Sequence, residues 1–133
     1  MLSTTTELWC PVWFTLPAQI DFWLNHPAVP EKKAAATRTA LPTMLPARRA
    51  DCWLKLYLFL SRARQAGPKP SNADVAALLA ELHESGVVEN AELRDLRPHL
   101  LRSTVSEFEW HRNRMRAAVL ARQSELLHQA HSA

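Results

Sequence analysis

The sequence predicts an all-α protein: a small single-domain bundle of four to five helices, with a Trp/Pro-rich irregular N-terminal arm and a long C-terminal helix. A length of 133 residues, 47% of them hydrophobic, allows one compact domain and makes a second one unlikely. Only two glycines occur, so few tight hairpin turns are available. Helix-forming residues fill the second half. We expect the arm and a connection over residues 1–46 and a helical core over residues 47–133.

The first thirty residues hold three of the five tryptophans and are interrupted by prolines, which exclude a long helix before Pro17. Residues 17–26, PAQIDFWLNH, predict one short helix with proline in its first turn. Within it, Ile20, Trp23 and Leu24 share a face, which we expect to pack inward. Residues 28–46 combine further prolines with small and basic residues, so they predict an extended or flexible connection.

The strongest apolar run, residues 53–60, alternates in the manner of a strand. Its context favours a helix, because helix formers precede it after Pro46 and the segment stops at Gly67. We therefore expect a helix from Ala47 to Ala66. Since its middle is apolar nearly all round, this helix is expected to be buried on most sides.

The next helix has a signal at each end. Ser71 and Asp74 form an S-x-x-D capping pattern, and Gly86 is placed to end the helix. The residues expected to face inward are Val75, Leu78, Leu79 and Leu82.

A third helix is expected to begin near Asn90 and to break or kink at Pro98. Neither Gly nor Pro follows Pro98, which predicts a long C-terminal helix. Its apolar seam consists of Leu101, Val105, Phe108, Met115, Val119 and Leu126, with Arg112 and Arg122 at two seam positions. Because charge interrupts this seam, we expect a monomer or a weak homodimer formed through the C-terminal helix.

Charge is zoned along the chain although the net charge is only +3. Residues 31–70 carry nine Lys or Arg and two acids, whereas residues 71–100 carry six acids and two Arg. Such a layout suits internal pairing and a charged partner equally well.

A nucleic-acid-binding protein is the alternative that the basic residues suggest, because arginine contacts phosphate and the neighbouring Trp110 can stack on a base. The candidate residues are Lys32, Lys33, Arg38, Arg48, Arg49, Arg112, Arg114 and Arg116. Glu107 and Glu109 lie among the C-terminal arginines, a mixture that is also typical of a solvated helix. A helix-turn-helix is disfavoured, since Glu92 and Asp95 would face the phosphates.

No catalytic, metal or cofactor site is expected. His128 and His131 form an H-x-x-H pair without a third ligand, and no glycine-rich phosphate loop is present. Cys10 and Cys52 lie far apart and are expected to be free thiols. We identify neither a signal peptide nor a membrane-spanning segment, which predicts a cytoplasmic protein.

The sequence therefore predicts a small non-catalytic regulatory, adaptor or inhibitor protein that acts by contact with another protein. Its size and its Ala/Arg/Leu richness would suit an accessory protein of a bacterium or a mobile element. The expected partner-binding residues are Trp9, Trp13, Phe14 and Trp23, because aromatic anchors dominate interface energetics. The same tryptophans can instead complete the core. A third alternative is an enzyme subunit whose site a partner completes.

Overall fold

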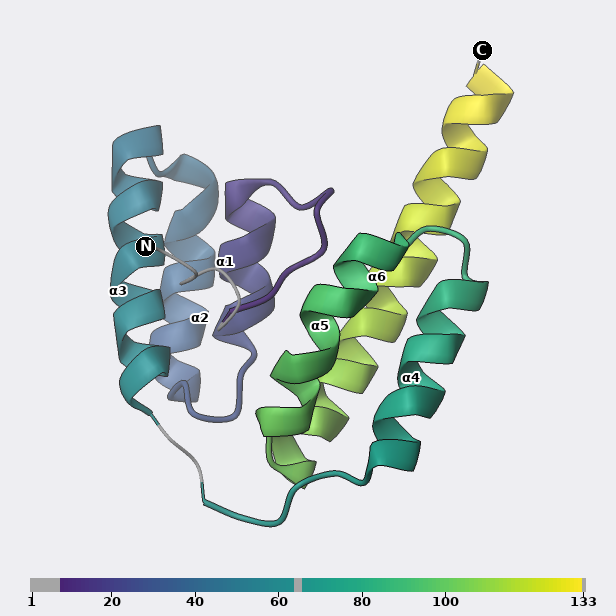
Figure 1. The fold of residues 1–133 in the computed structure, drawn as a ribbon. Coiled ribbons are helices and arrows are strands. Elements are labelled where there is room, and N and C mark those ends of the chain that lie inside the picture. Colours follow the sequence, from purple (N-terminus) through teal and green to yellow (C-terminus); the bar gives the residue numbers. More distant parts are fainter. Residues whose placement is uncertain (1–7, 64–65, 133) are drawn as a thin grey trace. The chain divides into compact units, whose positions relative to one another are not determined.

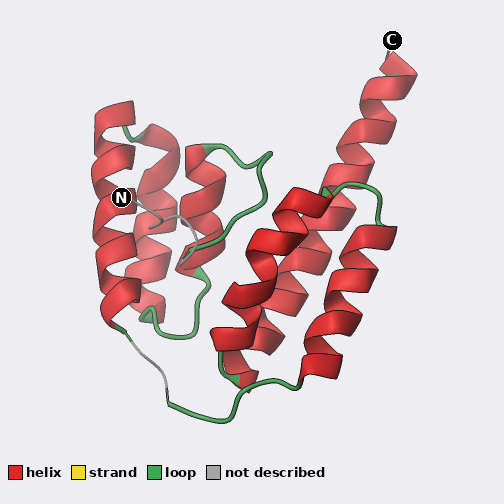
Figure 2. Ribbon diagram, in the orientation of Figure 1, coloured by secondary structure: helices red, strands yellow, loops and turns green. Residues whose placement is uncertain are grey.

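The computed structural model describes residues 8–63 and 66–132 (Figure 1). These residues form helices and no strand, so the all-α prediction is confirmed (Figure 2). The described elements are α1 (Leu16–Leu24), α2 (Glu31–Ala40), the 3-10 helix η2 (Leu41–Thr43), α3 (Pro46–Arg62), α4 (Asn72–Glu84), α5 (Asn90–Arg102) and α6 (Val105–Ser132). Six α-helices exceed the four to five expected, because α2 was not foreseen.

The chain divides into two compact units, Met1–Ala66 and Gly67–Ala133. The division falls after Ala66, and α3, which packs against α1, belongs to the first unit. The single domain stays a prediction.

Helix α1 is the centre of the first unit and contacts both α2 and α3. The Thr15 hydroxyl accepts a hydrogen bond from the backbone N–H of Ala18 at 3.4 Å, and Pro17 lies in the first turn. The inward face predicted for this helix is confirmed, since Ile20, Trp23 and Leu24 are all buried.

The prediction of an extended or flexible connection over residues 28–46 is wrong, because this segment contains α2 and η2. Three consecutive alanines, the best helix formers, lie at the centre of α2. Pro30 precedes the helix and Pro42 follows it, so both prolines bound the helix without interrupting it. Ala34 is buried, and α2 packs against α1.

The expectation that the 47–66 helix is buried on most sides is also wrong. Helix α3 ends at Arg62, and among its residues only Leu56 and Leu60 are buried. Leu54 is 53% exposed, Leu58 41% and Phe59 38%. The three-helix first unit covers one face of α3 and leaves this second apolar face open.

Helices α4 and α5 pack against each other in the second unit. The capping of α4 is confirmed: the Ser71 hydroxyl accepts from the backbone N–H of Asp74 at 3.0 Å. Gly86 follows the helix with φ +79°, a left-handed conformation that favours glycine. Of the residues expected to face inward, Val75, Leu78 and Leu82 are buried.

Of the break or kink predicted at Pro98, the break is wrong, because α5 continues through this residue to Arg102. A proline removes one hydrogen bond from a helix, and the buried Leu96 and Leu100 on either side hold the turn in place. The long C-terminal helix is confirmed, but it begins later, after Thr104. There the Thr104 hydroxyl accepts from the Glu107 N–H at 3.2 Å, and a Glu107 carboxylate oxygen accepts from the Thr104 N–H at 3.0 Å.

This capping box predicts a measurable contribution to stability. Thr104→Ala removes the hydroxyl acceptor and is expected to lower the free energy of unfolding by about 1 kcal/mol. The measurement is a urea titration followed by circular dichroism. Ser106→Ala, an exposed position in the same turn, is the matched control. Equal effects of the two substitutions would contradict the role of the cap.

Candidate functional site

A groove in the first unit lies between α2 and α3 and encloses about 230 Å³. Its lining residues are Leu24, Val29, Pro30, Lys33, Thr37, Met44, Arg48, Asp51, Cys52, Lys55, Leu56 and Phe59. The volume is below the roughly 300–1,000 Å³ of typical small-molecule and cofactor sites. The groove is therefore better suited to a few side chains of a partner than to a whole cofactor.

The groove has an apolar floor and a cationic rim. Buried Leu24 and Leu56 form part of the floor. The ionisable side chains of the rim are Lys33 from α2 and Arg48, Asp51 and Lys55 from α3. Three of these carry a positive charge and one a negative charge, so the groove attracts an anionic group at its edge.

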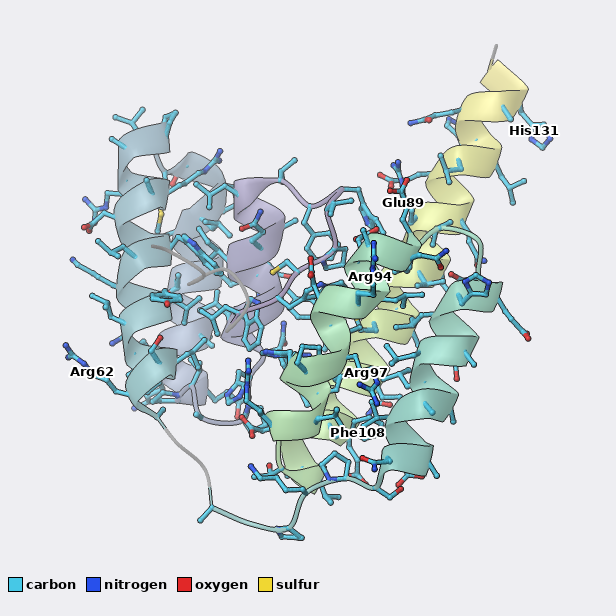
Figure 3. All side chains as sticks on the ribbon, in the orientation of Figure 1. Arg62, Glu89, Arg94, Arg97, Phe108 and His131 are labelled. Carbon is cyan, nitrogen blue, oxygen red and sulfur yellow. The ribbon has the colours of Figure 1, made fainter. Side chains whose placement is uncertain are left out.

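Three of the four cationic residues of α3 are evenly spaced. Arg48, Lys55 and Arg62 recur every seven residues, which is two helical turns, so they lie on one stripe about 10.5 Å apart. A second, more open hollow shares Lys55 and Phe59 with the groove and is also lined by Leu58, Arg62 and Ala63. Figure 3 shows the Arg62 side chain extending away from the end of α3.

Two local contacts order this rim. The Lys33 ammonium lies 5.8 Å from the centre of the Phe59 ring, a cation–π arrangement that joins α2 to α3. The Lys55 ammonium lies 3.1 Å from a carboxylate oxygen of Asp51, one turn earlier. Because both side chains of this ion pair are largely exposed, it contributes little stability, and a partner carboxylate can compete for Lys55.

The two cysteine thiols have different environments, and both are free. Burial raises the pKa of Cys10 to about 12, and its sulfur accepts a hydrogen bond from the Trp23 indole N–H at 3.0 Å. Cys52 lines the groove, where partial burial and then the neighbouring charge of Asp51 raise the pKa of its thiol. Both are poor nucleophiles, which argues against thiol catalysis.

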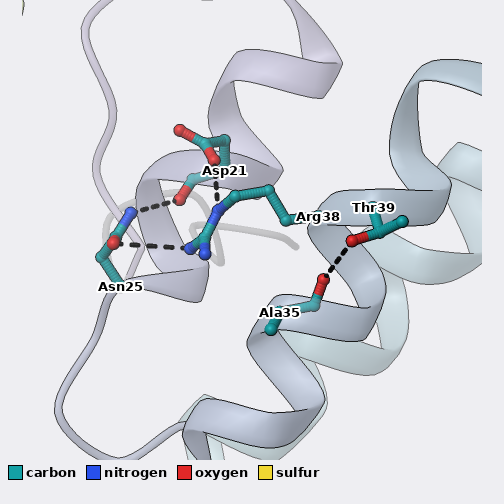
Figure 4. Close-up of polar contacts among 5 residues, drawn as sticks. All are labelled: Asp21, Asn25, Ala35, Arg38 and Thr39. Atoms are coloured by element: carbon teal, nitrogen blue, oxygen red, sulfur yellow. Dashed lines mark hydrogen bonds and ion pairs between the residues drawn. The ribbon is translucent and has the colours of Figure 1, made fainter.

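Several basic residues of the nucleic-acid alternative have structural contacts. The Arg38 guanidinium lies 2.9 Å from an Asp21 carboxylate oxygen and also donates to Asn25, which links α2 to α1 (Figure 4). Arg49 donates to the carbonyl oxygens of Leu41 and Pro42 and so ties η2 to α3. These contacts explain both arginines without a phosphate.

The C-terminal arginines belong to the second unit, whereas the groove is lined by residues of the first. Arg116 donates two hydrogen bonds to Glu81, at 2.7 and 2.9 Å, and this contact lowers the pKa of the Glu81 carboxyl. The Arg112 guanidinium lies 5.9 Å from the centre of the Phe108 ring, while Arg114 is half-buried. Of the eight candidate residues, Lys33 and Arg48 lie on the groove, and Lys32 is exposed on α2.

The tryptophans expected to bind a partner have limited exposure. Trp9 is 5% and Trp23 2% exposed, which favours the core alternative for these two residues. Trp13 and Phe14 are half-buried and continue an edge-to-face series with Phe22. A role in partner binding stays a prediction for Trp13 and Phe14.

Sequence reasoning missed the groove itself. Its wall includes Lys33 and Thr37 from α2, a segment that was expected to be irregular. The seven-residue recurrence of Arg48, Lys55 and Arg62 was the signal that could have identified the stripe, had the helix been considered as one-sided.

Other kinds of site receive little support. Among residues 8–63 and 66–132, no group of three or more His, Cys, Asp or Glu side chains is arranged to hold a metal ion. Within the same ranges, no helix has both the length and the apolar character that crossing a bilayer requires. Comparison with protein-family models, curated proteins and solved structures finds no match to the chain.

Proposed function

We propose that this chain is a small non-catalytic regulatory, adaptor or inhibitor protein that binds another protein through the α2–α3 groove and the adjoining open face of α3. One observation carries the proposal: α3 exposes Leu54, Leu58 and Phe59 beside a cation-rimmed groove. Contiguous exposed apolar side chains rimmed by polar ones are typical of protein-interaction surfaces.

Two physical arguments favour a protein over a nucleic acid at this surface. An apolar floor contributes binding energy only when a partner covers it with apolar side chains, which a phosphate backbone does not offer. In addition, Arg38 and Arg116 already pair with Asp21 and Glu81 within their own units.

The test is an affinity pull-down from a lysate of the cells that produce the protein, with wild-type and Leu58→Glu protein as paired baits. We expect a stoichiometric protein that binds wild type, survives nuclease treatment and is lost with Leu58→Glu, because the new carboxylate cannot be buried in a contact. Leu58 is 41% exposed, so this substitution is expected to leave the fold intact.

Leu120→Glu is the matched control, since Leu120 is an exposed leucine of α6 in the other unit. The proposal predicts that this variant retains the partner. Equal retention by wild type and Leu58→Glu would contradict a function of the groove. Retention of nucleic acid alone, lost as salt rises, would support the nucleic-acid alternative instead.

A further inference from the structure

We infer that the occupant of the groove is an amphipathic helix of the partner that carries acidic side chains at seven-residue spacing beside a leucine-rich stripe. This inference rests on the proposed function and specifies its partner. A helix laid into an apolar groove is one of the recurring modes of peptide recognition, and its anchors repeat with the helical period.

The geometry of α3 determines the spacing expected for the acidic side chains of the partner helix. Arg48, Lys55 and Arg62 lie about 10.5 Å apart on one stripe, and a second helix lying alongside places equivalent positions at the same interval. Between these cations, Cys52 and Phe59 lie on the same face and line the groove. A partner helix with apolar residues over Phe59 can therefore align an acidic side chain with each cation.

The positive charge of the rim favours a partner helix with acidic side chains. Lys33 faces the same groove from α2, so cations from two helices border the apolar floor, with Asp51 as the acidic exception. Complementary charge gives an acidic helix a faster association and a defined register. A basic helix would meet three like charges around the groove.

A second copy of this chain fits less well. The exposed apolar residues Leu120, Leu126 and Leu127 lie on α6, the helix through which the sequence predicts a weak dimer. Between residues 117 and 131, however, this helix carries one acid and one arginine, Glu125 and Arg122, which lie 3.5 Å apart. This segment offers no acidic row to match the cations of α3.

The probe is a synthetic helical peptide of about 21 residues, three heptads long, with a leucine stripe and one glutamate in each heptad beside it. Its control contains the same residues with the glutamates moved to the opposite face. Affinities are measured by fluorescence anisotropy with the full-length chain. We expect the first peptide to bind at least about tenfold more tightly than its control, and more weakly at about 300 mM than at about 50 mM salt.

Two substitutions on the rim are expected to change the affinity for the first peptide in opposite directions. Lys55→Glu is expected to weaken binding of the first peptide by about tenfold or more, because like charges then face each other. Among the described residues that line the groove, Asp51 is the one acid, and Asp51→Asn removes its charge and releases Lys55, so it is expected to strengthen binding about threefold. Both positions are exposed, so neither substitution is expected to unfold the chain.

Alkylation of the cysteines locates the bound peptide. Cys52 lines the groove, so peptide is expected to slow its alkylation, whereas the rate at Cys10, buried beside Trp23, is unchanged. Equal affinity for the two peptides, or unprotected Cys52, would overturn the acidic-helix inference. If Leu58→Glu still loses the natural partner in that case, the proposed function stands. Retention of that partner by Leu58→Glu would contradict the proposed function itself.

Discussion

Replacement of Leu56 by aspartate is expected to unfold the first unit. Leu56 is 8% exposed and lies on the face of α3 that packs against α1. Loss of the leucine side chain alone costs about 2–5 kcal/mol, and an unpaired buried carboxylate adds a further penalty. Together these costs approach the total of about 5–15 kcal/mol that stabilises a typical domain. Four of the five tryptophans lie in this unit, so a red shift of tryptophan emission and a loss of helical ellipticity report its unfolding.

Leu54→Asp is the matched control for this experiment. Leu54 lies on the same helix two residues earlier but is 53% exposed, so its replacement is expected to change the melting temperature little. The two variants together test whether α3 is buried on one face. Comparable destabilisation by both would show that α3 is buried all round, as the sequence alone suggests.

Met115→Asp is expected to unfold the second unit. Met115 is fully buried on α6, the helix that packs against α4, so the same two costs of lost packing and a buried charge apply. Trp110, the only tryptophan of this unit, provides a local fluorescence signal. In a urea titration followed by this fluorescence, the cooperative unfolding transition of the second unit is expected to be largely lost.

The control for Met115→Asp is Leu120→Asp, since Leu120 lies on the same helix and is 66% exposed. Its replacement is expected to leave the transition midpoint within the small range typical of surface substitutions. Midpoints that fall equally for both variants would contradict the assignment of the buried seam on α6.

Local signals account for the parts of the fold that were predicted correctly. Helix α4 lies between Ser71 and Gly86, and these two residues lie within a few positions of the helix ends that they specify. The capping box of Thr104 and Glu107 is equally local, and α6 begins there and not at Pro98. A proline in the last half of α5 costs one hydrogen bond, which the burial of Leu96 and Leu100 offsets.

The candidate site could not be predicted in the same way. The sequence pattern along α3 predicts an apolar helix with cations, but it does not indicate which side of the helix is covered. Only the positions of α1 and α2 determine that Leu56 and Leu60 face inward while Leu54 and Leu58 stay open. Likewise, the burial of Trp9 and Trp23 depends on the folding of the arm and not on its composition.

The sequence by itself determined the all-α class, the short helix after Thr15, the ends of α4 and the presence of a long C-terminal helix. Each of these depends on helix propensity, caps and periodicity, which act over a few residues. The tertiary structure alone decided the one-sided burial of α3 and the groove, where Leu24, Lys33 and Lys55 come together from three helices. Such features arise from packing between residues distant in the chain, and no local pattern encodes which faces meet.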